Sequence, residues 1–135
     1  MKKLLLISLI TLLLPACADK NQYEQAVLEQ MQKEQDIKDY KITPEHMTKC
    51  VVDTTSQSMP GLFAFDPKRL MAYRNYTKML TLTNSTDPKK TLEELRNDFG
   101  SAKELAEAHT NYTESLMECY SAVISESEEA TKEKK

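Results

Sequence analysis

The sequence of 135 residues contains no tryptophan and only two glycines, Gly61 and Gly100. A small β-domain normally needs more glycine for its turns and more β-branched residues for its strands. The composition therefore predicts an all-α fold, which we expect to be a small bundle of about four helices. So little glycine also leaves scant room for a phosphate-binding loop, and no nucleophile elbow or haem-attachment motif is present. We therefore expect no enzymatic activity and no cofactor.

Histidine is equally scarce, with His46 and His109 as the whole complement. Neither stands at a common metal-site spacing from cysteine or carboxylate residues, so we expect no metal. The chain also lacks a basic cluster: 18 lysines and arginines accompany 21 acidic residues, which gives a formal net charge of −3. A net acidic chain of this kind is poorly suited to phosphate backbones, so we expect no nucleic acid partner.

The longest apolar run is short. It extends from Leu4 to Leu14 behind Lys2 and Lys3, whereas a transmembrane helix needs about 20 apolar residues. A short apolar segment that follows positive charges and precedes small residues is typical of a secretory signal peptide. We therefore assign residues 1–16 to a signal peptide.

Leu14-Pro15-Ala16-Cys17 closes this run and resembles the bacterial lipoprotein signal, in which Leu and two small residues precede a Cys. Pro15 is an unusual residue at the second position. The resemblance implies that Cys17 is lipidated and anchors the protein to a membrane. In bacterial lipoproteins the residue after the lipidated cysteine influences sorting. Ala18 at this position resembles lipoproteins of the outer membrane, which implies an outer-membrane anchor that faces the periplasm. Inner-membrane anchoring and plain secretion to the periplasm remain alternatives, because Ala16-Cys17-Ala18 also fits ordinary signal peptidase.

Removing Cys17 from the count leaves Cys50 and Cys119, an even pair. Exported proteins fold in an oxidising compartment, so we expect these two cysteines to form a disulfide. The bond would join the first helix of the domain to the last one and so link the beginning of the fold to its end. Two buried free thiols are the alternative.

The mature chain is expected to have three parts. Residues 17–42 are mostly polar and are expected to form a lipid-anchored tether, helical or flexible, or a helix that docks loosely on the domain. An apolar residue recurs at every fourth position in this segment, at Tyr23, Val27 and Met31. Residues 43–125 carry the helical domain. Residues 126–135 are rich in Glu and Lys and are expected to form a charged, disordered tail.

Two helix starts combine an N-cap residue with proline at the first helical position. Thr43-Pro44 predicts a helix that runs to about Ser58, and Asp66-Pro67 predicts a second helix. The residues Ser58-Met59-Pro60-Gly61 end the first helix and begin the connection between the two.

Two further helix starts show the spacing of a capping box, at Thr91 with Glu94 and at Ser101 with Glu104. Gly100 lies between them. A single helix across Gly100 would be roughly 50 Å long, which is too long for so small a domain. We therefore expect a break at Gly100 and four helices in the domain.

The connection before Asp66 places large apolar residues next to a basic pair. Such a loop can fold inward as a lid over the core, or it can leave large side chains exposed. We expect at least one large side chain to stay exposed. The basic pair lies in the first turn of the next helix, where cations oppose the macrodipole, so a functional role is indicated. The predicted partner-binding site comprises Leu62, Phe63, Phe65, Lys68 and Arg69.

These features predict an envelope lipoprotein that acts as a non-enzymatic interaction module. Its lipid would hold it at the membrane, and its partner would be another envelope protein. The alternative is a small-ligand or metal-binding periplasmic lipoprotein that uses the apolar space between the helices.

Overall fold

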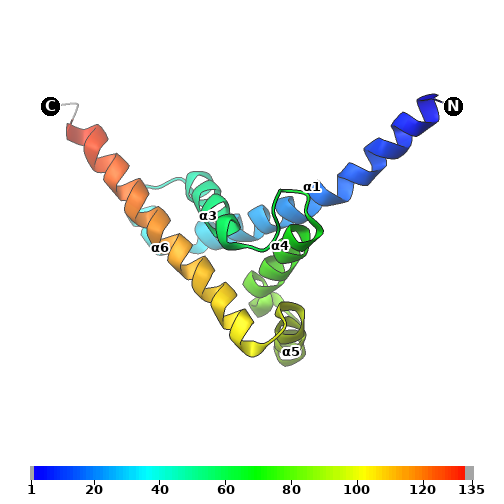
Figure 1. The fold of residues 1–135 in the computed structure, drawn as a ribbon. Coiled ribbons are helices and arrows are strands. Elements are labelled where there is room, and N and C mark those ends of the chain that lie inside the picture. Colours follow the sequence, from blue (N-terminus) through cyan, green and yellow to red (C-terminus); the bar gives the residue numbers. More distant parts are fainter. Residues whose placement is uncertain (1, 133–135) are drawn as a thin grey trace.

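The computed structural model describes residues 2–132, which form helices and the connections between them (Figure 1). Met1 of the expected signal peptide and residues 133–135 of the expected tail lie outside the described residues. So do the side chains before Cys17, that of Ser127 and those after Glu129. The described chain contains α1 (Lys2–Lys33), α2 (Gln35–Asp39), α3 (Pro44–Ser58), α4 (Pro67–Leu80), a 3-10 helix η1 (Leu82–Asn84), α5 (Pro88–Phe99) and α6 (Ala102–Lys132).

The all-α class is confirmed, and residues 2–132 contain six α-helices, more than the expected four. The helices α3 to α6 correspond to the four predicted ones, whereas α1 and α2 precede them. The start predicted at Thr91 is wrong, because α5 begins at Pro88. The Asp87 carboxylate caps α5 there by accepting a hydrogen bond of 3.1 Å from the backbone N–H of Lys90. An acidic N-cap followed by proline thus starts both α4 and α5.

The predicted break at Gly100 is confirmed. Gly100 follows the last residue of α5 with a φ of +105°, in the left-handed region that favours glycine. A Cβ at this position would also collide with the carboxylate of Glu104. Ser101 and Glu104 form the predicted cap of α6, since the Glu104 backbone N–H donates to the Ser101 hydroxyl oxygen at 3.1 Å and that hydroxyl donates to the Glu104 carboxylate at 3.2 Å.

Two long helices, α1 and α6, form the arms of a V that opens toward the two termini (Figure 1). The helix α1 packs on α3 and α4, and α6 packs on α3 and α5. The helix α3 therefore lies between the arms, while α5 lies at the start of α6 and also packs on α4. The helix α6 runs on to Lys132, so residues 126–132, where we expected the tail to begin, are helical.

The segment expected to form a tether or a loosely docked helix contributes side chains to the core. The apolar stripe Tyr23, Val27 and Met31 of α1 is 0% exposed, and α2 adds the buried side chain of Ile37. A spacing of four residues places these side chains on one face of a helix. Burying one such side chain stabilises the fold by about 1.5–3 kcal/mol. The helix α1 packs on α3 and α4, so of these two expectations the structure has the docked helix.

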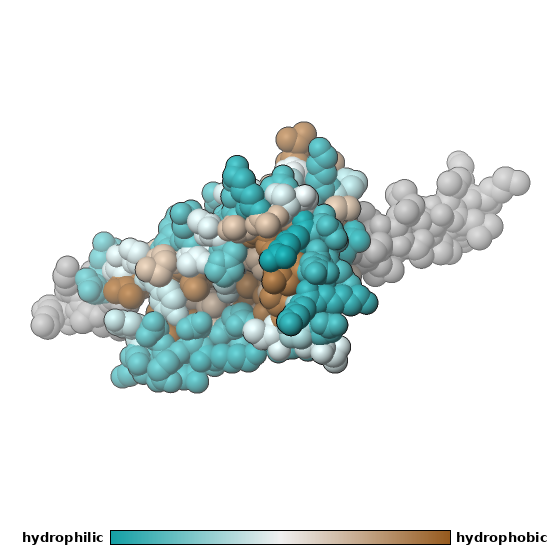
Figure 2. Space-filling model, turned by 90° about the horizontal axis from the view of Figure 1, so that it is seen from below, coloured by the Kyte–Doolittle hydropathy of each residue, from teal (hydrophilic) through white to brown (hydrophobic). Residues whose placement is uncertain are grey.

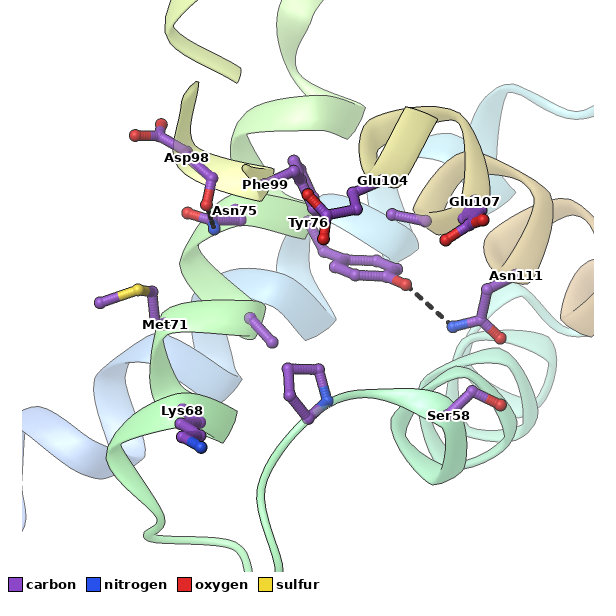
Figure 3. Close-up of a pocket in the computed structure, with 13 residues that line it drawn as sticks. Ser58, Lys68, Met71, Asn75, Tyr76, Asp98, Phe99, Glu104, Glu107 and Asn111 are labelled. Atoms are coloured by element: carbon purple, nitrogen blue, oxygen red, sulfur yellow. Dashed lines mark hydrogen bonds between the residues drawn. The ribbon is translucent and has the colours of Figure 1, made fainter. Parts of the chain in front are cut away.

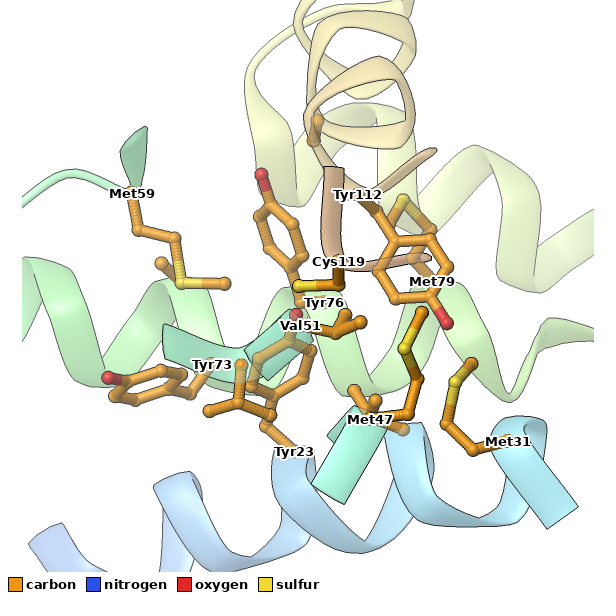
Figure 4. Packing of buried hydrophobic residues seen from close by; sticks show 14 of the residues in the cluster. Tyr23, Met31, Met47, Val51, Met59, Tyr73, Tyr76, Met79, Tyr112 and Cys119 are labelled. Atoms are coloured by element: carbon orange, nitrogen blue, oxygen red, sulfur yellow. The ribbon is translucent and has the colours of Figure 1, made fainter. Parts of the chain in front are cut away.

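Methionine and tyrosine fill most of the core (Figure 4). An unbranched methionine side chain adapts to the irregular gaps between helices that cross at different angles, which suits a core without tryptophan. The buried side chains labelled in Figure 4 are Tyr23, Met31, Met47, Val51, Met59, Tyr73, Tyr76, Met79, Tyr112 and Cys119.

The side chain of Tyr23 joins α1 to its neighbours. Its ring stacks on that of Tyr73 with 5.7 Å between centroids and meets the ring of Tyr76 edge-on at 5.8 Å. Its hydroxyl forms a buried hydrogen bond of 2.9 Å with the hydroxyl of Thr55 in α3. The hydroxyl of Tyr76 accepts a hydrogen bond of 2.9 Å from the amide of Asn111 in α6. This tyrosine cluster therefore connects α1, α3, α4 and α6.

The predicted disulfide is confirmed. Cys50 of α3 and Cys119 of α6 are bonded, with Cα atoms 5.8 Å apart and a sequence separation of 69 residues. The bond joins the first helix of the predicted domain to the last one. Closing a loop of this length stabilises the fold by about 4 kcal/mol in the chain-entropy model.

Replacing both cysteines, Cys50→Ser with Cys119→Ser, should lower the free energy of unfolding by about 2–5 kcal/mol, because the unfolded chain regains conformational freedom. Urea unfolding of the variant and the natural protein without reductant measures the difference. Thiol titration of the denatured natural protein should find no free thiol at either position. Equal stability of the two proteins would contradict the prediction.

The buried tyrosines predict a loss of stability at alkaline pH. Burial raises the pKa of Tyr23 and Tyr76, and it raises the pKa of Tyr112 to about 12, whereas tyrosine in an unfolded chain titrates near pH ~10. Because the folded state holds the neutral form, the contribution is fully present below about pH 10 and is lost as the pH rises through the folded-state pKa.

Tyr112→Phe isolates one of these groups, because the Tyr112 hydroxyl has no hydrogen-bond partner among the described residues. As the pH rises from about 10 to about 12, the free energy of unfolding should fall less in the variant than in the natural protein. Urea unfolding at each pH measures both values. An equal loss in both proteins would show that Tyr112 does not contribute to alkaline unfolding.

Candidate functional site

Residues 59–66 connect α3 to α4 and form a loop with an apolar tip, which we call the interaction loop. Leu62 is 94% exposed, Phe63 is 61% exposed and Phe65 is 52% exposed. Met59, by contrast, is buried in the core and fixes the start of the loop. The expectation that at least one large side chain stays exposed is confirmed, and the lid alternative is wrong for these three.

The guanidinium group of Arg69 holds the interaction loop from the inside. It donates hydrogen bonds to the backbone carbonyls of Pro60 at 3.0 Å, Met59 at 3.1 Å and Gly61 at 2.9 Å, and to that of Ser56 in the last turn of α3. A planar group with five N–H donors can serve several carbonyls at once. Arg69 therefore supports the loop, a role that sequence analysis did not predict, while its predicted part in partner binding stays a prediction.

The carboxylate of Asp66 holds the same loop from its other end. It accepts hydrogen bonds from the backbone N–H groups of Leu62 at 3.0 Å and Lys68 at 2.9 Å, and these bonds keep its pKa below the usual value. Gly61 fits between the loop and α4 with a φ of +104°, where a Cβ would lie 2.8 Å from that of Arg69. The backbone of the interaction loop is thus fixed while its apolar side chains face solvent.

A groove beside the interaction loop lies between α4, the junction of α5 with α6, and Pro60 of the loop (Figure 3). Its volume is about 560 Å³, within the range of small-molecule sites. Tyr76 and Phe99 supply aromatic surface, and three acidic residues line one side, so we call it the acidic groove. These acidic residues are Asp98, Glu104 and Glu107. Figure 2 shows the molecule from below, with hydrophobic residues in brown exposed between hydrophilic residues in teal.

The basic residues of α4 have different surroundings. Lys78 forms ion pairs of 2.8 Å with Glu94 and 2.9 Å with Asp98 of α5, and these hydrogen bonds raise its pKa. Lys68 is exposed at the edge of the interaction loop and lines the acidic groove. It forms no ion pair with the residues that the structure describes. Lys68 is thus the basic residue of the predicted site that is free to contact a partner.

The expected lipidation residue, Cys17, is exposed. The domain begins almost immediately after it, because the Asp19 carboxylate lies 3.2 Å from the guanidinium of Arg74 in α4. Tyr23, one helical turn further, is already in the core. A lipid on Cys17 would therefore be attached directly to the folded domain.

Sequence reasoning missed the inward role of Arg69 and the acidic groove. The groove combines residues of three separate segments, and no local spacing marks it. The available signal for Arg69 was its position shortly after a helix end with proline and glycine, where carbonyls need donors.

Among the residues that the structure describes, no three His, Cys, Asp or Glu residues form a group that could hold a metal ion.

Comparisons with known proteins give no relative: no family model, no curated protein and no solved structure matches this chain. Within residues 2–132, no helix is both long enough and apolar enough to cross a membrane.

Arg69→Ala should destabilise the fold by about 1–3 kcal/mol, because it removes the donor to several backbone carbonyls. Lys68→Ala is the matched control in the adjacent position and should change stability by less than about 0.5 kcal/mol. Urea unfolding measures both effects. Chymotrypsin should also cut the Arg69→Ala variant faster within the interaction loop, after Leu62, Phe63 or Phe65. Equal stability and equal cutting of the two variants would contradict the supporting role of Arg69.

Proposed function

We propose that the protein is an envelope lipoprotein that acts as a non-enzymatic interaction module. Cys17 carries the lipid, the outer membrane holds that lipid, and the domain faces the periplasm. The interaction loop is the surface through which the module contacts another component of the envelope. Leu62, Phe63, Phe65 and Lys68 make this contact.

The observation that carries the proposal is the combination of exposure and fixed backbone in the interaction loop. Leu62 is 94% exposed, although Arg69 and Asp66 hold the backbone on both sides of it. Clustered exposed apolar side chains mark contact surfaces. Aromatic anchors beside a charge are typical of binding hot spots. Because the loop is already ordered, binding requires little further loss of conformational entropy.

The acidic groove supports a second candidate function, the binding of a small ligand. Aromatic side chains beside carboxylates suit a partly apolar ligand that carries a positive charge. Tyr76 and Phe99 would contact its apolar part, and Glu107 would contact its charge. A ligand that remains bound through purification and is lost in Glu107→Gln would favour this function.

A photoreactive amino acid in place of Phe63 tests the proposed contact in the bacterium that makes the protein. Because Phe63 lies at the apolar tip, this variant should crosslink to an envelope component. The same amino acid in place of Tyr40 is the matched control, since Tyr40 is also 61% exposed. Tyr40 follows α2, beyond the far end of α1 from Cys17, so this variant should crosslink much less.

Mass spectrometry of the mature N-terminus of the same protein determines whether Cys17 is acylated. A mature chain that begins at Asp19 without lipid would reject the anchor. Equal crosslinking from the two positions would reject the interaction loop as the contact surface. Both variants should melt like the natural protein, because both replaced side chains are exposed.

A further inference from the structure

We infer that the interaction loop docks on the lipid surface to which Cys17 is anchored, with Leu62 and Phe63 inserted at the level of the acyl chains. This inference rests on the proposed function, because it requires a lipid on Cys17. It names the bilayer as the envelope component that the loop contacts.

The interaction loop lies at the same end of the domain as Cys17. The helices α1 and α4 run in the same direction: Asp19 of α1 pairs with Arg74, and Gln30, further along α1, donates to the carbonyl of Leu80 at the end of α4 at 3.2 Å. The start of α4 therefore points toward the Cys17 end of α1. The interaction loop directly precedes that start (Figure 1).

The link between anchor and domain is too short to separate them. One residue, Ala18, lies between Cys17 and the ion-paired Asp19. A lipid on Cys17 would therefore hold this end of the domain against the headgroups. A protein partner of the interaction loop would have to fit between this end and the bilayer, whereas the bilayer already lies there.

The side chains of the interaction loop have the composition of an interfacial membrane contact. Leu62, Phe63 and Phe65 are exposed, and Met71 is exposed in the first turns of α4. Lys68 is exposed beside them and can extend its ammonium group to the headgroups while its apolar stem stays among the acyl chains. Anionic headgroups would add to this attraction.

Part of the tip's backbone is also prepared for an apolar environment, in which an unsatisfied N–H or C=O group is costly. The N–H of Leu62 donates to Asp66, and the carbonyl of Gly61 accepts from Arg69. The carbonyl of Phe63 accepts from the backbone N–H of Asp66 at 3.0 Å. These three backbone groups around Leu62 are thus already hydrogen-bonded within the protein before the tip meets lipid.

Tryptophan fluorescence tests the inference, because the chain contains no tryptophan and each variant then has a single one. Phe63→Trp places the probe at the tip. Tyr40→Trp is the matched control, equally exposed at 61% and separated from Cys17 by the length of α1, roughly 24 Å from Cys17 to Lys33. The mature full-length proteins are purified from the membrane and reconstituted in phosphatidylethanolamine–phosphatidylglycerol vesicles with or without brominated acyl chains.

Brominated lipid should quench the Phe63→Trp variant several-fold more than the Tyr40→Trp variant, and the emission of Phe63→Trp should shift to shorter wavelength on reconstitution. Leu62→Trp should repeat the result if Phe63→Trp melts below the natural protein. An acylated protein whose two variants are quenched equally would overturn the inference and leave the interaction loop to a protein partner. A protein without acyl chains on Cys17 would instead overturn the proposed function.

Discussion

Tyr23 brings three helices together, since its ring lies against Tyr73 and Tyr76 of α4 and its hydroxyl reaches Thr55 of α3. This contact decides what α1 is. Without it, the N-terminal segment would be a polar helix with a narrow apolar stripe and nothing to cover that stripe. With it, α1 joins the core from Tyr23 onward, six residues after Cys17, and any group attached to Cys17 is held in a defined position on the domain.

Arg69 shows how one residue can serve two helices in opposite ways. Its charge is unfavourable in the first turn of α4, because the positive end of that helix dipole lies there. Its guanidinium nevertheless reaches the carbonyl of Ser56 at the end of α3, where a cation is favourable, and also binds the carbonyl of Gly61. The charge that is unfavourable at the start of α4 is therefore favourable at the end of α3. The exposed tip follows from this arrangement, because a loop bonded on its inner side presents its side chains outward.

The parts of the fold that could be predicted are those that local chemistry determines. The Asp66-Pro67 cap, the Gly100 break and the Ser101 cap each depend on residues that are close in sequence. The disulfide could be predicted because removing Cys17 leaves a single pairing. The docking of α1 could not, since the spacing of Tyr23, Val27 and Met31 shows a face of a helix without showing what covers it. The position of Arg69 after a helix end marks a possible donor to free carbonyls, but it does not decide the direction of the side chain, because a basic residue there can also face solvent.

The tyrosine cluster and the disulfide act on different parts of α3, and together they fix both arms of the V. Thr55 binds Tyr23 of α1 near the end of α3, whereas Cys50, more than one turn earlier, is bonded to Cys119 of α6. Asn111 of α6 adds bonds to the carbonyl of Thr55 and to the hydroxyl of Tyr76. Because these contacts converge on α3, a turn of α6 relative to α1 would break one or more of them. The acidic groove, which α4 and α6 line, is therefore held in a fixed orientation relative to Cys17, so a lipid there would orient the groove as well as the interaction loop.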